Sequence, residues 1–301
     1  MRRRLLIGAG LAVALALGTF VYFKTRALST PEQILARLPS DDASVLSIDF
    51  AMLRKAGVFE MLNGSAIGEE PEYTAFVNKT GFNYQRDLDR AFLAFHPSGV
   101  YFLVDGRFDW KRLEAYASEQ GGGCYNGLCR MQGSQPNRKI SYFPLKSNLM
   151  ALAVSPDDWA ATRMNEPARN ARPIAILQQP VWLSLPAAVL KKSEAFPTGT
   201  QLFAKAMEDA HSATLSLAPE GQALELRLDV VCRNAQEASI LTAQFQKVTS
   251  VLRELIAKEH QKPGPGDAAT VLMAGVFRQD DARVTGHWPI ARAFLEHLAG
   301  K

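Results

Sequence analysis

The stretch AFLAFHPSGVYFLV, residues 91–104, decides the fold because it holds two apolar runs joined by a turn sequence. Proline sets φ for the second position of a type I turn and glycine closes the turn without steric cost, so His96–Gly99 is a turn. The flanking runs then predict a β-hairpin. A related stretch, ATLSLAPEGQALEL at residues 213–226, begins 122 residues later, with Pro219 and Gly221 in the equivalent turn positions. Two such hairpins predict a duplicated domain.

The rest of the chain repeats one order of elements around these hairpins. Residues 41–165 and residues 181–301 each follow the order strand, helix, hairpin, helix, hairpin, helix. Residues 166–180 form a connector in which prolines break regular structure. The core of each order is β-α-β-β-α-β, the ferredoxin-like arrangement with an added hairpin. We therefore predict an α+β fold of two duplicated ferredoxin-like halves with mainly antiparallel sheets and the helices on one face.

Capping residues and helical spacing mark several helices. Thr30 and Gln33 have the spacing of a capping box, and Asp109 is placed to cap a helix over residues 110–120. Apolar residues recur at helical spacing through residues 235–258, which predicts a longer helix in the second half.

The two hairpins differ in the spacing of their apolar residues. Residues 224–230 alternate between apolar and charged side chains, which is typical of a sheet with one face in water. Residues 92–95 and 100–104 do not alternate, so both faces of the first hairpin should be covered. The cover is the other half, the stalk helix, a partner protein or a bound apolar ligand. The candidate apolar interaction surface consists of Phe92, Phe95, Tyr101 and Leu103.

Residues 1–24 are predicted to be a membrane anchor. The stretch 5–23 has 19 residues without a charge, and a helix of that length spans the hydrocarbon core of a bilayer. Arg2–Arg4 precede it, which favours a cytoplasmic N-terminus. A cleaved signal peptide is the alternative, because Ala12-Val13-Ala14 and Ala14-Leu15-Ala16 fit the small-x-small pattern of a cleavage site. With an uncleaved anchor, residues 25–40 form a stalk helix, and we expect a single-pass protein of the bacterial inner membrane with residues 25–301 in the periplasm or outside.

The charge balance argues against a nucleic-acid partner. The formal charge of the chain is +4, but Arg2–Arg4 supply three of the positive charges. Residues 24–301 carry 31 basic and 30 acidic side chains, since three of the 34 basic residues and none of the 30 acidic ones precede Lys24. A nucleic-acid-binding protein would show a concentrated basic face, and the sequence contains no such cluster.

The cysteines fit an oxidising compartment. Cys124 and Cys129 flank the turn signal Asn126-Gly127, which places them opposite each other across a hairpin and close enough for a disulfide. A metal site is the alternative, but two further ligands are missing. Cys232 remains as a buried unpaired thiol in an apolar strand.

The sequence contains no recognisable catalytic or cofactor motif. The histidines are not at metal-ligand spacing, and the paired acids lie where a loop, a turn or a helix start explains them. We therefore predict no catalytic residue, no cofactor and no metal ligand, and hence a protein that is not an enzyme.

Three stretches carry a resemblance to known sequences, namely LPSDDASVLSID (38–49), TGFNYQRDLDRAFLAF (80–95) and GRFDWKRLEAYA (106–117). They resemble a group of membrane-anchored bacterial envelope proteins of unknown function. The resemblance implies an extracytoplasmic α+β module and transfers no functional residue to this chain.

These observations favour a non-enzymatic, membrane-tethered interaction module with a protein partner in the envelope, such as an accessory subunit of a larger membrane complex. Two alternatives are a periplasmic carrier of a lipid or other apolar ligand, and a hydrolase that uses acids in a cleft between the halves.

Overall fold

The computed structural model describes residues 30–62, 71–133, 135–197, 200–220, 223–258, 264, 267–291 and 293–294. The predicted membrane span, residues 5–23, lies outside these ranges. Within them, no helix is both long enough and apolar enough to cross a bilayer.

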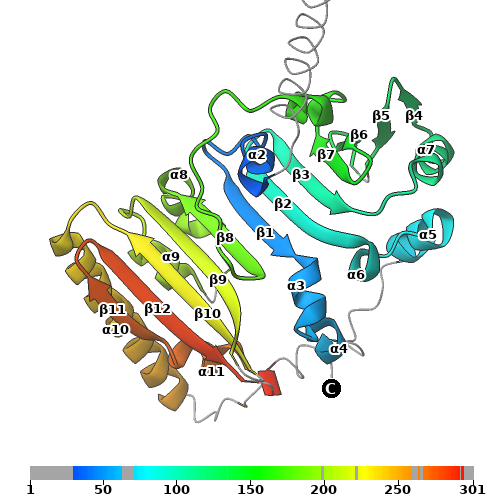
Figure 1. Ribbon diagram of the computed structural model, residues 1–301. Coiled ribbons are helices and arrows are strands. Elements are labelled where there is room, and N and C mark those ends of the chain that lie inside the picture. Colours follow the sequence, from blue (N-terminus) through cyan, green and yellow to red (C-terminus); the bar gives the residue numbers. More distant parts are fainter. Residues whose placement is uncertain are drawn as a thin grey trace, which may run out of the picture.

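The strands of the described residues form one antiparallel sheet of twelve, in the order β11-β12-β10-β9-β8-β1-β2-β3-β7-β6-β5-β4 (Figure 1). Every neighbouring pair among them is antiparallel, as predicted. The strands of the first half are β1 (Ser44–Asp49), β2 (Leu88–His96), β3 (Gly99–Gly106), β4 (Gly123–Tyr125), β5 (Leu128–Gln132), β6 (Lys139–Lys146) and β7 (Leu149–Ser155). Those of the second half are β8 (Val181–Pro186), β9 (Ser212–Glu220), β10 (Ala223–Val231), β11 (Val276–Asp280) and β12 (Arg283–Ile290).

The two halves have the same strand order. The order β1-β2-β3-β7-β6 corresponds to β8-β9-β10-β12-β11, and the hairpin β4–β5 is an addition to the first half. The equivalent strands β1 and β8 pair with each other, with Leu46 opposite Leu183 and Ser47 opposite Trp182. The repeat seen in the hairpin sequences is therefore also present in the topology, and the halves share one sheet.

The predicted ferredoxin-like arrangement is wrong. That arrangement is a split β-α-β unit, in which another strand separates the two strands that a helix connects. Here β1 and β2 are direct neighbours, and β3 follows β2. The physical reason is the connection between β1 and β2, which consists of several short helices and returns the chain to the end of the sheet that it left.

The helices were predicted to lie on one face of the sheet, but they lie on both. They are α2 (Pro31–Leu35), α3 (Phe50–Lys55), α4 (Val58–Leu62), α5 (Pro71–Thr80), α6 (Tyr84–Asp87), α7 (Trp110–Glu119), α8 (Ala187–Leu190), α9 (Gln201–Ala206), α10 (Ala235–Lys258) and α11 (Ala268–Met273), with short 3₁₀ helices at Ala160–Asn165 and Ser193–Ala195. The helix α2 packs on the face opposite to α7, α9 and α10. The capping box at Thr30, the cap at Asp109 and the bounds of α10 agree with the sequence predictions.

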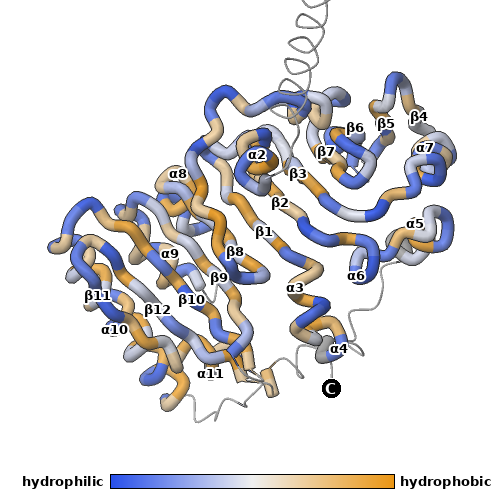
Figure 2. The backbone as a smooth tube through the Cα atoms, in the orientation of Figure 1, coloured by the Kyte–Doolittle hydropathy of each residue, from blue (hydrophilic) through white to orange (hydrophobic). Residues whose placement is uncertain are grey.

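Neighbouring residues of the central strands belong to cores on opposite faces of the sheet, because side chains alternate along a strand. Ala151 of β7 packs under α2 and the connector, whereas Met150 packs under α7. In the same way Trp182 of β8 faces α2, and Leu183 faces the core beneath α9 and α10. Both faces of the centre are therefore apolar, and in Figure 2 β8 and much of β1 and β2 are orange.

The guanidinium of Arg172 holds the connector against the centre of the sheet. It donates hydrogen bonds to the carbonyl oxygen of Ser40 at 3.0 Å and to the hydroxyl and carbonyl oxygens of Ser184 at 3.1 Å each. The backbone N–H of Arg172 also donates to the Ser40 hydroxyl at 3.0 Å. Ser40 and Ser184 are buried, so these bonds satisfy polar groups that water does not reach. One side chain thus joins the connector, the segment after α2, and β8.

We expect Arg172→Met to lower the free energy of unfolding by about 2–4 kcal/mol, because it leaves several buried acceptors without a donor. Urea unfolding measures the change. Arg169→Met is the control, because Arg169 is an exposed arginine of the same connector. Equal midpoints for the two variants would show that the connector does not depend on this guanidinium.

Candidate functional site

The four residues predicted to form an apolar interaction surface do not form one. Phe92, Tyr101 and Leu103 are buried at 2%, 4% and 0% exposure, whereas Phe95 is 44% exposed and lies on the opposite face. The stalk helix α2, the connector and Trp182 cover the three buried side chains, so the chain itself provides the cover for this face of the hairpin. The prediction of a surface was wrong because the strand pattern does not say which part of the chain returns to it.

The predicted disulfide is confirmed. Cys124 of β4 and Cys129 of β5 are direct partners across the hairpin, with 4.0 Å between their Cα atoms. Asn126 and Gly127 form the turn with positive φ angles of 49° and 81°, a conformation that Asn-Gly adopts readily. Such a disulfide is typical of an oxidising compartment. Cys232 is free and buried, as predicted, and burial raises the pKa of its thiol, which makes it a poor nucleophile.

An apolar cavity of about 240 Å³ lies next to this disulfide, between the sheet and the helices α5 and α7. Its lining is apolar or aromatic and comes from α5, α7, the strands β2, β3, β5, β6 and β7, and the residues that precede α6 and α7. The lining residues are Phe76, Phe82, Leu88, Val104, Phe108, Leu113, Tyr116, Met131, Tyr142, Met150 and Leu152.

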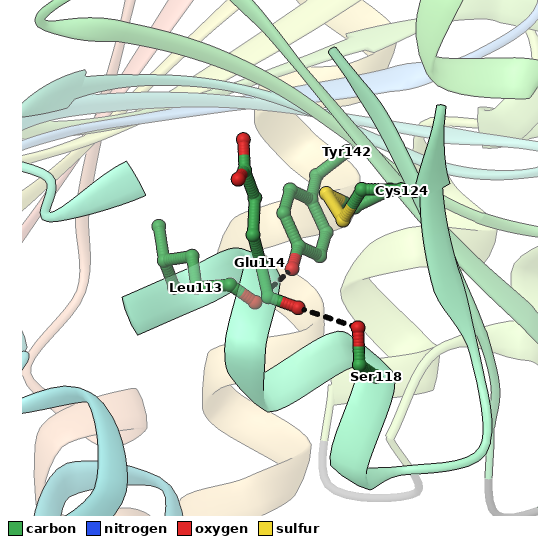
Figure 3. Close-up of a disulfide and its surroundings, with 6 residues drawn as sticks. Leu113, Glu114, Ser118, Cys124 and Tyr142 are labelled. Carbon is green, nitrogen blue, oxygen red and sulfur yellow. Dashed lines mark hydrogen bonds between the residues drawn. A yellow bond between two sulfur atoms is a disulfide. The ribbon is translucent and has the colours of Figure 1, made fainter. Parts of the chain in front are cut away.

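The helix α7 is held over the cavity by contacts at its start and its middle. The Asp109 carboxylate accepts a hydrogen bond from the backbone N–H of Arg112 and caps the helix. The Tyr142 hydroxyl of β6 donates to the carbonyl oxygen of Leu113 at 2.6 Å, and Figure 3 shows its ring beside Cys124. Burial raises the pKa of Tyr142 well above its ordinary value, so the phenol remains protonated and keeps donating. The hydroxyl is thereby engaged with the backbone rather than with the cavity.

Aromatic rings form the outer wall of the cavity. Phe76 and Tyr116 meet edge to face at 5.1 Å between ring centroids, and Phe82 stacks on Phe108 at 5.9 Å. Phe76, Phe82 and Phe108 are only partly buried, so this wall of the cavity lies at the protein surface.

A second, polar cavity of about 660 Å³ adjoins the apolar one, and Phe82, Phe108 and Leu113 line both. Its charged lining residues are Arg86, Asp87, Arg107, Asp109, Lys111 and Arg112.

Asp87 is the buried carboxylate of this polar cavity. Arg86 donates to its two oxygens at 2.9 and 2.7 Å, and the backbone N–H of Asn83 donates to Oδ2 at 2.9 Å. These bonds, chiefly those from Arg86, hold the pKa of Asp87 below its usual range. The carboxylate therefore remains ionised and organises the loop between α5 and β2.

No three His, Cys, Asp or Glu side chains in the described ranges lie close enough together to hold a metal ion. His96 lies near Asp41, with 3.7 Å between Nε2 and Oδ1, and His287 lies 3.3 Å from Glu225. His96 is on β2 and His287 is on β12, so the two pairs are far apart in the sheet order.

The sequence indicated the helical face of residues 110–120 but not the cavity beneath it. The only available signal was the number of aromatic residues in residues 76–116. A core and a cavity produce the same apolar pattern, because the pattern does not reveal how closely the side chains pack.

Comparisons with known proteins place the fold but not the activity. No family model matches the chain, and no curated protein matches it. Two crystal forms of TP0453 share the fold with a TM-score of 0.51 and 11% sequence identity. The matches cover 91% of this chain and 98% and 99% of the TP0453 chains. The chain therefore has the architecture of this α+β protein.

We expect the Cys124→Ser/Cys129→Ser double variant to lose about 2 kcal/mol of unfolding free energy, the amount that loop-closure entropy assigns to a short disulfide loop. Thermal unfolding of the two proteins, each with and without reductant, measures the change. Reductant should lower the midpoint of the parent protein and leave that of the variant unchanged. A parent protein indifferent to reductant would contradict the expectation.

We expect Asp87→Asn to be less stable than the parent at pH 7 by about 1 kcal/mol, because it removes a charge-assisted pair whose arginine is exposed. The pKa of Asp87 is lowered by folding, so its contribution is present above the ordinary carboxyl pKa of about 4 and is lost as the pH falls through the lower folded value. Urea unfolding as a function of pH should therefore show the two curves converging in acid. The control is Asp89→Asn, which alters a more exposed carboxylate.

Proposed function

We propose that the protein is a membrane-tethered, extracytoplasmic binding protein for a lipid or other apolar ligand. The observation that carries the proposal is the apolar cavity beneath α5 and α7, which is open at its aromatic wall. Well-packed interiors contain few spaces of this size, because each lost contact costs dispersion energy. An unfilled apolar space that opens to the surface is therefore best explained by a ligand.

The size and lining of the cavity suit an alkyl chain or an aromatic ring. An apolar cavity of about 150 Å³ is large enough to bind benzene, and this one is about 240 Å³. A ligand would exchange water for the side chains of Val104, Leu152 and their neighbours, at roughly 25 cal/mol per Å² of apolar surface buried.

The proposed cellular location is supported by two separate features. The uncharged stretch of residues 5–23 follows Arg2–Arg4, which supports an anchor in the inner membrane with a cytoplasmic N-terminus. The disulfide supports an oxidising compartment for the folded part.

A binding role is better supported than the alternatives. The interaction module rested on a surface of Phe92, Phe95, Tyr101 and Leu103. The chain buries three of these side chains and leaves Phe95 exposed on the opposite face of the hairpin. The hydrolase was predicted to use acids in a cleft between the halves, whereas the polar cavity and its carboxylates Asp87 and Asp109 lie within the first half and beside arginines. We therefore propose binding without catalysis.

Photolabelling of the full-length protein tests this function. The probe is a neutral ten-carbon alcohol with a diazirine in its chain, and the protein is kept in digitonin, whose rigid sterol body does not fit the cavity. We expect labelled peptides to come from the cavity lining. Labels spread over the exposed surface would contradict the proposal.

Val104→Phe should reduce labelling of the cavity by about tenfold, a loss of about 1.4 kcal/mol in affinity, because the added ring occupies the space. Val100→Phe is a matched control, since Val100 lies on the same face of the same strand but does not line the cavity. Urea unfolding of both variants verifies that each is folded. Equal labelling of the two variants would place the ligand elsewhere.

A further inference from the structure

The apolar cavity and the polar cavity adjoin and form one site with an apolar part and a charged part. Phe82, Phe108 and Leu113 line both, so the stacked pair of phenylalanine rings is the boundary between an apolar compartment and a charged one. A molecule that extends past this boundary would have one end among apolar side chains and the other among ions.

The polar compartment carries an excess of positive charge. Its lining has four cationic side chains, Arg86, Arg107, Lys111 and Arg112, and two carboxylates, Asp87 and Asp109. The excess is therefore two positive charges. Since residues 24–301 as a whole are nearly neutral, this excess belongs to the site and does not reflect a basic protein.

Two of these arginines, Arg107 and Arg112, are held less closely by carboxylates than Arg86 is. Arg107 also donates a hydrogen bond to the backbone carbonyl oxygen of Arg86, and this bond lies at the surface. Arg86 is held by Asp87 and also donates to the carbonyl oxygen of Gly81 at 2.8 Å. Arg107 and Arg112 are 3.5 and 3.4 Å from their carboxylates, longer than the 2.7–2.9 Å of a close charge-assisted hydrogen bond. Their side chains are 68% and 59% exposed, so they can turn toward an incoming anion without breaking a buried contact.

The apolar compartment cannot hold the polar end of a ligand. The buried Tyr142 hydroxyl in its wall already donates its hydrogen bond to the carbonyl oxygen of Leu113. The rest of the lining is almost entirely hydrocarbon or aromatic. A buried charge without a partner is strongly disfavoured, so a charged head must remain on the arginine side of the boundary.

We propose that the ligand is an anionic amphiphile, with its chain in the apolar cavity and a carboxylate or phosphate head at Arg107 and Arg112. This inference rests on the proposed function and adds the chemical class of the ligand. Guanidinium groups bind both kinds of head in a bidentate manner, so the shared chemistry is an oxyanion on an alkyl chain.

The test compares three photoprobes on the full-length protein in digitonin. All have the same ten-carbon diazirine chain, and they end in a carboxylate, a phosphate monoester or a hydroxyl. We expect at least one anionic probe to label the cavity peptides about tenfold more strongly than the alcohol, and the preference to weaken at high salt. A stronger signal for carboxylate or for phosphate identifies the head.

The Arg107→Gln/Arg112→Gln variant should lose the preference for the anionic probes and keep its labelling by the alcohol. Arg138→Gln/Arg169→Gln is the control, because it removes the same charge at exposed positions outside the site. If all three probes label the cavity equally in the parent protein, the inference of an anionic head group is wrong, whereas the proposed apolar binding site is supported. If none labels the cavity, the proposed function fails and this inference fails with it.

Discussion

The antiparallel pairing of β1 with β8 is the constraint on which the rest of the structure depends. These two strands are the equivalent first strands of the two halves, and their pairing joins a seven-stranded unit and a five-stranded unit into one sheet. Without it, each half would expose an apolar strand edge and half of the core that contains Trp182. The connector and Arg172 then lie across the junction, so the segment that separates the halves in sequence also holds them together.

The junction also decides where a ligand site can be. The centre of the sheet is closed on one face by α2 and the connector, whereas the long helix α10 covers the end of the second half. At the other end, α5 and α7 cover the sheet through aromatic rings, with Phe76 meeting Tyr116 edge to face and Phe82 stacked on Phe108. Beneath α10 the rings of Phe203, Phe245, Phe277 and Trp288 pack against one another and are buried, whereas Phe76, Phe82 and Phe108 beside α5 and α7 are only partly buried. The apolar cavity beside α7 therefore belongs to the first half.

The sequence was sufficient to predict the features that depend on neighbours in the chain. The turn at Asn126-Gly127, the disulfide beside it, the cap at Asp109 and the bounds of α10 each depend on a few consecutive residues. The order of the strands was not predictable, because several short helices between β1 and β2 return the chain to the same end of the sheet, whereas the ferredoxin-like prediction assumed a single crossing. The cover of Phe92 was not predictable for the same reason, since it comes from residues more than fifty positions away. The cavity could not be recognised because its aromatic residues have the same spacing as a filled core.

The order of the sheet leaves β4 and β11 as its two outer strands, and each of these edges is open to pairing with another molecule. Unpaired backbone groups on an outer strand can recruit a strand from another molecule and start aggregation. Different features limit this pairing at the two edges. β4 is only three residues long and is tied to β5 by the disulfide, which leaves little edge to extend. β11 carries the exposed polar residues Arg278, Gln279 and Asp280 in succession, which would place charge against any incoming apolar strand. The disulfide hairpin therefore also keeps a wide, duplicated sheet from growing between molecules.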